Sequence, residues 1–366
     1  MRVLFLTKYT ATGPSSRYRV VQFLPFLEAR GITWDLHALH GDGYLEARYA
    51  RHRPSPVYLA RRAASRVAVL SRAPRYDLVF IQKELFPHAL DLPEWLLRRV
   101  GARYVVDLDD AIHLFYEGAR GWRRPLRGKM ARVLSGASLV LAGNRHLEAY
   151  ARGRGARAVH FPTVVDTARF QPGPPRVGAQ PLVVGWMGTP ETAPYLYTLA
   201  PALEAAARRV PFLLRVVGAE APALRGVAVE ARPWRVADEV GDLQSMDVGL
   251  MPLADDPWSM GKCSLKLLQY MSAGVSAVTS PLGSAPDIVS DGENGFFARG
   301  DDEWADRVTL LASSPDLRRA MAERARRTVE ARYSLAVWGP RFADALLAAA
   351  EGRLPADAGP HAAYSA

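Results

Sequence analysis

Two lysines near the start of a short helical pattern could together hold an anion. In the stretch "GKCSLKLLQYMSAG", Ser264 is placed to cap a helix, with Lys262 just before it and Lys266 in the first turn. A cation in the first turn opposes the helix dipole unless an anion binds beside it. The free N–H groups of such a helix end, together with two ammonium groups, suit a phosphate. The same pattern is also compatible with two solvated surface lysines.

A group of acidic residues follows an apolar run in the first half of the chain. The stretch "RYVVDLDDAIH" places Asp109, Asp110 and His113 directly after a strand pattern. A DxD pattern binds metal ions in some proteins, but it is too short to predict a metal site by itself. These side chains could orient the hydroxyl groups of a substrate, or the carboxylates could cap the following helix.

Polar residues also follow two other strand patterns of the first half. The stretch "TGPSSRYR" brings four candidates to a loop and the helix after it: Gly13, Ser16, Arg17 and Arg19. The arginines could contact a phosphate, or they could form a solvated helix face. The stretch "FIQKELFP" places Lys83 and Glu84 at another strand end, and only this position makes them candidates.

Apolar runs of strand length recur along the chain, each followed by a helical pattern. Those of the first half begin near residues 2, 76, 103 and 137, and those of the second half near 182, 212, 247 and 276. Strands that alternate with helices predict parallel sheets covered on both faces. Because such sheets bind ligands at the carboxyl ends of their strands, the polar loops described above should gather at those ends.

A segment rich in proline and glycine separates two similar halves, which predicts two doubly wound α/β domains. The predicted limits are 1–170 for the first domain, 171–181 for the linker, 182–335 for the second domain, 336–349 for a C-terminal helix packing back on the first domain, and 350–366 for a disordered tail. A helix should run from about Arg17 to Arg30. Another, from about Leu317 to Ala349, should break or kink near Pro340.

The composition favours a cytoplasmic protein with an anionic ligand or partner. The 366 residues carry a net charge of +10, and Cys263 is the only cysteine, which excludes an intramolecular disulfide. The N-terminal apolar run is too short for a signal peptide, and no run reaches the roughly 18 residues of a membrane span. A basic first domain would suit peripheral contact with the inner membrane face. Scattered arginines without a nucleic-acid motif argue against nucleic-acid binding.

The second half of the chain resembles a known enzyme family. The stretch "LKLLQYMSAGVSAVTSPLGSAPDIVSDGENGFF" follows, almost position for position, the C-terminal domain of retaining glycosyltransferases of family 4. The stretch "FPTVVDTARFQP" is similar to the segment between the two domains of that family. The resemblance implies the GT-B fold, in which two Rossmann-like doubly wound domains face each other across a cleft.

The resemblance also implies transfer of a sugar from a nucleotide-diphosphate donor, with retention of the anomeric configuration and without a metal or other cofactor. The implied donor-binding residues are Gly188, Thr189, Trp234, Lys262, Ser264, Lys266 and Gln269. The acceptor or diphosphate side would contain Gly13, Ser16, Arg17, Arg19 and Glu84, and the catalytic residues would be Asp109, Asp110 and His113. The acceptor stays open between a polysaccharide, a lipid-linked molecule, a small metabolite and a protein.

Two positions depart from the family pattern. Gly261 and Gln269 stand where the family has glutamates for the donor sugar and the ribose, and the loop 185–196 lacks the family's cations. Gln269 can still hydrogen-bond a ribose hydroxyl, whereas Gly261 offers no side-chain contact. Two alternatives therefore remain open: a nucleotide-sugar 2-epimerase of the same fold, and a nucleotide-sugar-binding protein without catalytic activity.

Overall fold

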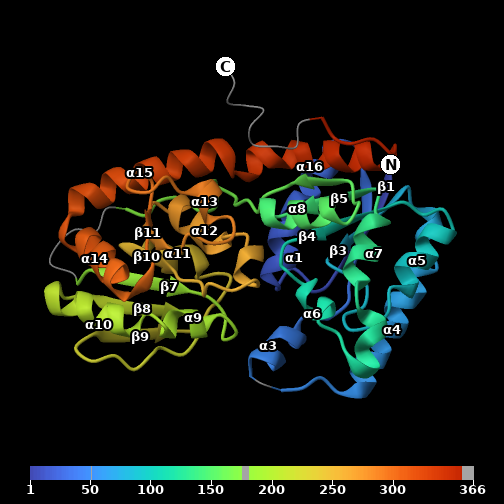
Figure 1. The fold of residues 1–366 in the computed structure, drawn as a ribbon. Coiled ribbons are helices and arrows are strands. Elements are labelled where there is room, and N and C mark those ends of the chain that lie inside the picture. The colour runs from blue at the N-terminus through green and yellow to red at the C-terminus, as the bar shows by residue number, and fades with distance from the viewer. Residues whose placement is uncertain (51, 175–180, 357–366) are drawn as a thin grey trace. The chain divides into compact units, whose positions relative to one another are not determined.

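The chain forms two compact units in a computed structural model (Figure 1). The structure describes residues 1–50, 52–174 and 181–356. Unit 1 contains Met1–Thr163, Met260–Cys263 and Trp338–Ala366, and unit 2 contains Val164–Ser259 and Ser264–Val337. The domain limits expected from the sequence stay predictions. Parts of the predicted linker 171–181 and of the predicted tail 350–366 lie outside the described residues.

Unit 1 is built on a six-stranded parallel sheet with the strand order β2-β1-β3-β4-β5-β6. The strands are β1 (Arg2–Thr7), β2 (Thr33–Ala38), β3 (Leu78–Gln82), β4 (Tyr104–Leu108), β5 (Leu139–Ala142) and β6 (Ala158–His160). Every residue of β3, β4 and β5 is buried, as expected of parallel strands with both faces covered. Parallel pairing brings the carboxyl ends of these strands to one edge of the sheet.

Unit 2 repeats this architecture with the strand order β12-β11-β10-β7-β8-β9. The strands are β7 (Val183–Met187), β8 (Leu213–Val217), β9 (Ala228–Arg232), β10 (Val248–Met251), β11 (Ser276–Thr279) and β12 (Phe296–Phe297). Trp186 and Leu250 from the sheet pack in one core with Met321 from a covering helix. The two parallel sheets confirm the α/β class predicted from the alternating pattern.

Helices fill the connections between the parallel strands of each sheet. Those of unit 1 include α1 (Pro14–Arg19), α2 (Leu24–Glu28), α3 (Gly43–Tyr49), α4 (Pro56–Leu70), α5 (Leu92–Arg99), α6 (Leu114–Glu117), α7 (Lys129–Ser135) and α8 (Arg145–Gly153). Those of unit 2 include α9 (Ala193–Tyr197), α10 (Ala200–Arg209), α11 (Glu239–Gln244), α12 (Leu265–Ser272), α13 (Ala285–Ile288), α14 (Gly300–Ser313) and α15 (Pro315–Arg332). None of the helices in the described ranges is long and apolar enough to cross a membrane.

The helix predicted from Arg17 to Arg30 is divided in the structure. α1 ends at Arg19, a 3-10 turn covers Val21–Phe23, and α2 begins at Leu24. Pro25 lies in the first turn of α2, where its missing N–H needs no partner. The proline therefore starts a new helix here and cannot continue the earlier one.

The break predicted near Pro340 lies elsewhere. The last helix, α16, runs from Leu335 to Ala350 with Pro340 inside it, and the interruption falls between Arg332 and Leu335. There the chain pairs with the backbone of Val165, which donates to the Tyr333 carbonyl and accepts from the N–H of Leu335. These backbone bonds hold the chain out of the helical path before the proline is reached.

Aromatic packing joins α16 to the core of unit 1. The ring of Phe342 stacks on Phe23 at a centroid distance of 4.5 Å and lies 5.6 Å from Phe80 and from Phe161. Phe342 is fully buried. This burial offsets the backbone hydrogen bond that Pro340 cannot donate.

A buried ion pair joins α1 to β4 within unit 1. The guanidinium of Arg19 binds Asp107 through Nε and Nη2, the latter 2.5 Å from Oδ1, and both side chains are almost completely buried. Nη1 of Arg19 also donates to the carbonyl of Phe161 at 2.9 Å. The guanidinium of Arg19 is therefore engaged within the fold and is not exposed for the predicted phosphate contact.

Replacing Arg19 by Met should lower the free energy of unfolding by about 3–5 kcal/mol, because the Asp107 carboxylate would stay buried without its partner. Urea unfolding at neutral pH measures the change. Arg30→Met is the matched control, since the pair of Arg30 with Asp344 at 3.2 Å is half exposed and should contribute at most about 1 kcal/mol. Equal losses in the two variants would contradict a structural role for the buried pair.

Candidate functional site

A cluster of charged residues lies at the carboxyl edge of the sheet in unit 1. Lys83 follows β3 with a left-handed backbone (φ 67°), and Asp109 and Asp110 follow β4. The Lys83 ammonium lies 3.0 Å from Oδ1 of Asp109 and 2.7 Å from Oδ2 of Asp110. The structure thus brings both predicted carboxylates together around a lysine that only its position after a strand had suggested.

Lys262 completes this cluster from a distant part of the sequence. Its ammonium lies 3.0 Å from Oδ1 of Asp110. The short segment Met260–Cys263 belongs to unit 1, where Asn144 donates to the carbonyls of Met260 and Lys262 at 3.0 and 3.1 Å. The thiol of Cys263 donates to the carbonyl of Asp109 at 3.3 Å, and burial raises the pKa of this thiol. The donor-binding role of Lys262 stays a prediction.

The two ammonium groups fix the protonation state of Asp110. Burial disfavours its charge, but Lys83 and Lys262 outweigh burial and lower the pKa of Asp110 to about 2. Burial likewise opposes the charge of Lys83, while Asp109 and Asp110 raise the pKa of this lysine. Asp110 is therefore ionised at neutral pH and is a weak base. It can accept a hydrogen bond from a hydroxyl group, but it is poorly suited to removing a proton.

The first turn of α1 is bonded to the same edge of the sheet. Ser15 Oγ donates to Oδ2 of Asp109 and accepts from Nε2 of Gln82 at 3.0 Å. The buried Ser16 Oγ donates to Oε1 of Gln82 at 2.8 Å. Ser16 therefore lies beneath the cluster as a support, and its neighbour Ser15, which the sequence did not single out, contacts the cluster directly.

Two other predicted residues, Gly13 directly before α1 and Arg17 within it, lie close to tyrosine side chains. A Cβ atom at Gly13 would come within 2.5 Å of Cβ of Tyr9, so the loop has no room for a larger residue there. Arg17 is half-buried, with its guanidinium 5.0 Å from the ring centroid of Tyr18. Neither contact identifies a ligand, and the acceptor-side roles of Gly13 and Arg17 stay predictions.

Two further predicted residues of unit 1 form packing contacts. His113 is buried with its ring stacked on Tyr150 at 3.8 Å, and burial lowers the pKa of His113. Glu84 accepts hydrogen bonds from the hydroxyl of Tyr116 at 2.6 Å and from the fully buried Lys129 at 2.5 Å. These contacts are typical of structural side chains, and they place neither residue against the lysine and aspartate cluster.

In unit 2, two glycines allow the backbone to close tightly at the carboxyl ends of β7 and β8. The N–H of Gly188 donates to the carbonyl of Val217 at 2.9 Å. Gly218 has φ 88°, and a Cβ atom there would lie 2.2 Å from the Gly188 carbonyl oxygen and 3.1 Å from Cβ of Trp234. The predicted residues Gly188 and Trp234 therefore both lie beside Gly218.

Lys266 lies against the loop that follows β7. Its ammonium is 3.3 Å from Oγ1 of Thr192 and 4.5 Å from the ring centroid of the buried Trp186. The same Thr192 oxygen accepts the N–H of Thr189 at 3.1 Å. The hydroxyl of Tyr270 in α12 accepts the N–H of Met187 at 3.0 Å, at the end of β7. The helix start and the strand end, 78 residues apart from Gly188 to Lys266, thus lie against each other.

Ser264 occupies the position before α12, but its side chain does not cap the helix. Its backbone is left-handed (φ 51°, ψ 35°), whereas a capping serine needs an extended backbone. The prediction is therefore right about the position of Ser264 before the helix but wrong about the capping hydrogen bond of its side chain. The buried Ser264 hydroxyl has no hydrogen-bond partner among the described residues. The first N–H groups of α12 also have no partner within the helix.

Gln269 joins α12 to α11. Its Nε2 donates to Oε1 of Glu239 at 3.2 Å, and Oε2 of Glu239 pairs with Arg169 at 2.8 Å. Gln269 and Glu239 are both buried. Sequence reasoning did not single out Glu239, although an acid in the first turn of a helix after a strand and loop is a signal for a polar site. The ribose role of Gln269 stays a prediction.

Gly261 leaves no space for a side chain. A Cβ atom at this position would lie 2.5 Å from the backbone nitrogen and 2.6 Å from Cβ of Ala111, within unit 1. Real contacts of this kind are not observed, so any larger residue would have to displace the loop after β4. A glutamate, which the family has at this position, could not be accommodated here unless the surrounding backbone took another path.

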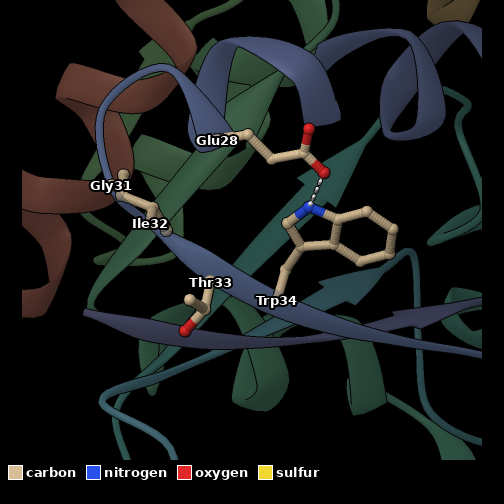
Figure 2. Close-up of a pocket in the computed structure, with 5 residues that line it drawn as sticks. All are labelled: Glu28, Gly31, Ile32, Thr33 and Trp34. Carbon is tan, nitrogen blue, oxygen red and sulfur yellow. Dashed lines mark hydrogen bonds between the residues drawn. The ribbon is translucent and has the colours of Figure 1, made fainter.

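Other features of the described residues do not compete with these two sites. A surface pocket of about 420 Å³ is lined by residues 28 and 31–34, and Figure 2 shows Trp34 donating through Nε1 to Glu28 at 3.2 Å. It lies at the start of β2, whereas the candidate residues follow strand ends. Within the described ranges, no group of three or more His, Cys, Asp or Glu residues is arranged to hold a metal ion.

Part of unit 2 matches a known protein family. Residues 181–314 match the family model described as Glycosyl transferases group 1. This segment contains the loop after β7, Trp234 and the whole of α12. No curated protein matches the chain.

Solved structures with the same fold cover nearly the whole chain. HepE of Anabaena in complex with UDP is 17% identical with a TM-score of 0.69, over 95% of this chain and 100% of that one. A glycosyltransferase from Rickettsia africae is 13% identical with a TM-score of 0.68, over 96% and 98%. Sucrose-phosphate synthase from Thermosynechococcus elongatus is 14% identical with a TM-score of 0.67, over 93% and 97%. These likenesses confirm the predicted GT-B fold.

Asp110→Asn should lower the free energy of unfolding at neutral pH by on the order of 2 kcal/mol, in a pH-dependent way. Folding lowers the pKa of Asp110 from 3.8 to about 2, so its contribution is complete above about pH 5 and is lost as the pH falls through 4 toward 2. Urea unfolding of both proteins from about pH 7 to 3 measures this. A difference that does not shrink below about pH 4 would rule out the lysine-stabilised carboxylate.

Gly261→Ala should destabilise the protein by about 1–3 kcal/mol, because the added methyl group would overlap the backbone at Ala111. Gly153→Ala is the matched control, since a Cβ atom there meets no atom within 4 Å. The midpoints of urea unfolding give the comparison. If both alanine variants unfold at the wild-type midpoint, the loop after β4 has more freedom than the contact distance indicates.

Proposed function

We propose that the protein is a glycosyltransferase that moves a sugar from a nucleotide-diphosphate donor to an acceptor with retention of the anomeric configuration. The observation that carries this proposal is the position of Lys266, at the start of α12 and against the loop after β7. This arrangement lies within the segment that matches Glycosyl transferases group 1. The GT-B fold alone would not be sufficient, because one fold can serve several functions.

The donor diphosphate would bind at this end of α12. The Lys266 ammonium and the first N–H groups of the helix supply positive charge, and Thr189 offers a hydroxyl. Cleavage of the bond between sugar and phosphate builds negative charge on the leaving diphosphate. Fixed positive groups stabilise that charge more than the ground state, which lowers the barrier.

The nucleoside end of the donor would lie near Gly218 and Trp234. The left-handed backbone at Gly218 brings the ends of β7 and β8 close to Trp234. HepE has been solved in complexes with UDP and with UDP-glucose. We therefore take a uridine diphosphate sugar as the first donor to test.

On the acceptor side, Asp109 and Asp110 would orient hydroxyl groups. Their position beside Lys83 and the low pKa of Asp110 favour hydrogen-bond acceptance over proton removal. In this proposal the leaving diphosphate takes up the acceptor proton as the new glycosidic bond forms and the bond to the donor breaks. Charge on the diphosphate would be met by Lys266, so the proposed reaction does not require a metal.

A nucleotide-sugar-binding protein without turnover is the second candidate. Gly261 favours it, because the position where the family contacts the donor sugar has no room for any side chain. A nucleotide-sugar 2-epimerase differs from the transferase in that it acts on the donor without an acceptor. Incubating the donor alone separates these readings: an epimerised donor supports the epimerase, and an unchanged donor leaves the transferase and the binding protein.

The decisive experiment is a thermal-shift screen against nucleotide sugars, followed by turnover assays with the stabilising donor. A bound donor raises the melting temperature by mass action, so the screen identifies base and sugar together. Release of nucleoside diphosphate that depends on an added acceptor would support the transferase. If no nucleotide or nucleotide sugar shifts the melting temperature, the proposed function is wrong.

Lys266→Ala should weaken binding of the donor found in that screen by about 1–3 kcal/mol, the scale of a lost charge-assisted hydrogen bond. Calorimetry with the free nucleoside diphosphate and with the nucleoside separates the phosphate contribution: only the diphosphate should lose affinity. Arg208→Ala on the exposed side of α10 removes an equal charge from unit 2 and serves as control. Equal affinities of wild type and Lys266→Ala for the diphosphate would remove Lys266 from the site.

A further inference from the structure

Helix α5 of unit 1 turns an apolar face to the solvent. Its side chains Leu92, Trp95 and Leu96, with Val100 just after it, are 43–58% exposed, whereas Leu97 is buried. Positions i, i+3, i+4 and i+8 lie on one side of a helix, so these four side chains form one stripe. In Figure 1 this helix lies at the outer edge of unit 1. A solvent-facing apolar stripe on a surface helix is unusual unless it binds something.

A second exposed apolar residue lies in the 3-10 segment Gly121–Leu126. Trp122 is 88% exposed, the highest value among the exposed large apolar side chains of the described residues. Exposing an indole to this extent sacrifices most of the burial energy that a tryptophan can contribute. Four arginines surround it in the sequence: Arg120, Arg123, Arg124 and Arg127.

One arginine ties these two exposed elements together. The guanidinium of Arg132 pairs with Asp91, directly before α5, at 2.7 Å. It also donates to the carbonyl of Arg127 at 2.8 Å and to that of Pro125 at 3.5 Å. The start of α5 and the end of the Trp122 segment are therefore neighbours. We name this surface the α5 patch; it comprises Leu92, Trp95, Leu96, Val100, Trp122 and the arginines beside them.

The α5 patch carries uncompensated positive charge. Arg98, Arg99, Arg120, Arg123, Arg124 and Arg127 form no ion pair with any described residue, and Arg99 lies over the ring of Trp95 at 4.8 Å. The carboxylates nearby in the sequence are already engaged or buried. Asp91 pairs with Arg132, Glu117 pairs with Arg154 at 3.3 Å, and Glu94 is buried. Nothing in the patch balances its arginines.

We propose that the α5 patch binds the surface of an anionic lipid bilayer. Tryptophan side chains favour the interface between lipid headgroups and acyl chains, and arginines beside them are attracted to anionic headgroups. An exposed amphipathic helix with apolar and aromatic residues on one face and arginines at its rim fits that interface. The combination of exposed indole rings with unpaired arginines distinguishes such a surface from a purely apolar protein interface.

A second copy of this chain is a poorer occupant. Pairing the α5 patch with itself would bring two sets of unpaired arginines together, which costs free energy through like-charge repulsion. A bilayer with anionic headgroups removes this penalty. The inference does not rest on the proposed reaction, because it is tested by binding alone.

Flotation with vesicles tests the proposal on the full chain. The protein should float with vesicles of phosphatidylcholine containing about 30% phosphatidylglycerol, should stay unbound with phosphatidylcholine alone, and should dissociate as salt is raised, because salt screens the charges. Trp122→Ser and the double variant Arg123→Gln/Arg124→Gln should each bind the anionic vesicles about tenfold more weakly or worse. Both changes affect exposed or half-buried side chains, and their melting temperatures should match the wild type.

Matched variants on unit 2 distinguish binding through the α5 patch from nonspecific attraction of a basic protein to anionic vesicles. Arg208→Gln/Arg225→Gln removes two exposed arginines, and Tyr197→Ser removes an exposed aromatic ring; both should bind like the wild type. Loss of binding in these controls equal to that in the patch variants would overturn the proposal. So would failure of the wild type to float at low salt, or a dimer in solution that Trp122→Ser dissociates.

Discussion

Three carboxylates follow one another closely at the end of β4, and their mutual repulsion is relieved by three separate cations. Asp107 pairs with Arg19, Asp109 with Lys83, and Asp110 with Lys83 and Lys262. Removing one partner from such a buried pair costs on the order of 3–5 kcal/mol. The path of α1, the left-handed turn at Lys83 and the position of the segment Met260–Cys263 are all tied to these pairs. Most of the local geometry of unit 1 at this edge follows from that single requirement.

The candidate site of unit 2 contains fewer charged side chains than the cluster of unit 1. Lys266 lies over the ring of Trp186 and donates to the hydroxyl of Thr192. A lysine in the first turn also lies at the positive end of the helix dipole. An anion bound beside the helix start would be favoured there, which is the physical basis of the proposed phosphate site. In the cluster of unit 1, the charges of Asp109 and Asp110 are balanced by Lys83 and Lys262.

The alternating strand and helix patterns were sufficient to predict the α/β class, because buried parallel strands must be apolar along their whole length. The GT-B fold was predicted only from the resemblance to family 4 glycosyltransferases. The resemblance implied that Lys266, Gly188 and Thr189 bind the donor, and the structure places Lys266 against the loop after β7. The donor-binding role of these residues stays a prediction. Arg19 could not be assigned correctly, since a sequence does not show which of two arginines in one turn points into the core. Glu239 and Ser15 were missed because their partners, Gln269 and Asp109, lie far away in the sequence. The break predicted at Pro340 was wrong because the packing of Phe342 offsets the backbone hydrogen bond that the proline cannot donate.

Cys263 gives the molecule an internal reporter. It is the only cysteine of the chain, it lies in the short segment that belongs to unit 1, and burial suppresses its thiolate form. Thiols react with alkylating reagents as thiolates, so this one is silent while the segment stays packed. Its labelling rate therefore measures how often Met260–Cys263 detaches from the end of β4. Alkylation of Cys263 thus reports local opening beside the cluster of Lys83, Asp109, Asp110 and Lys262.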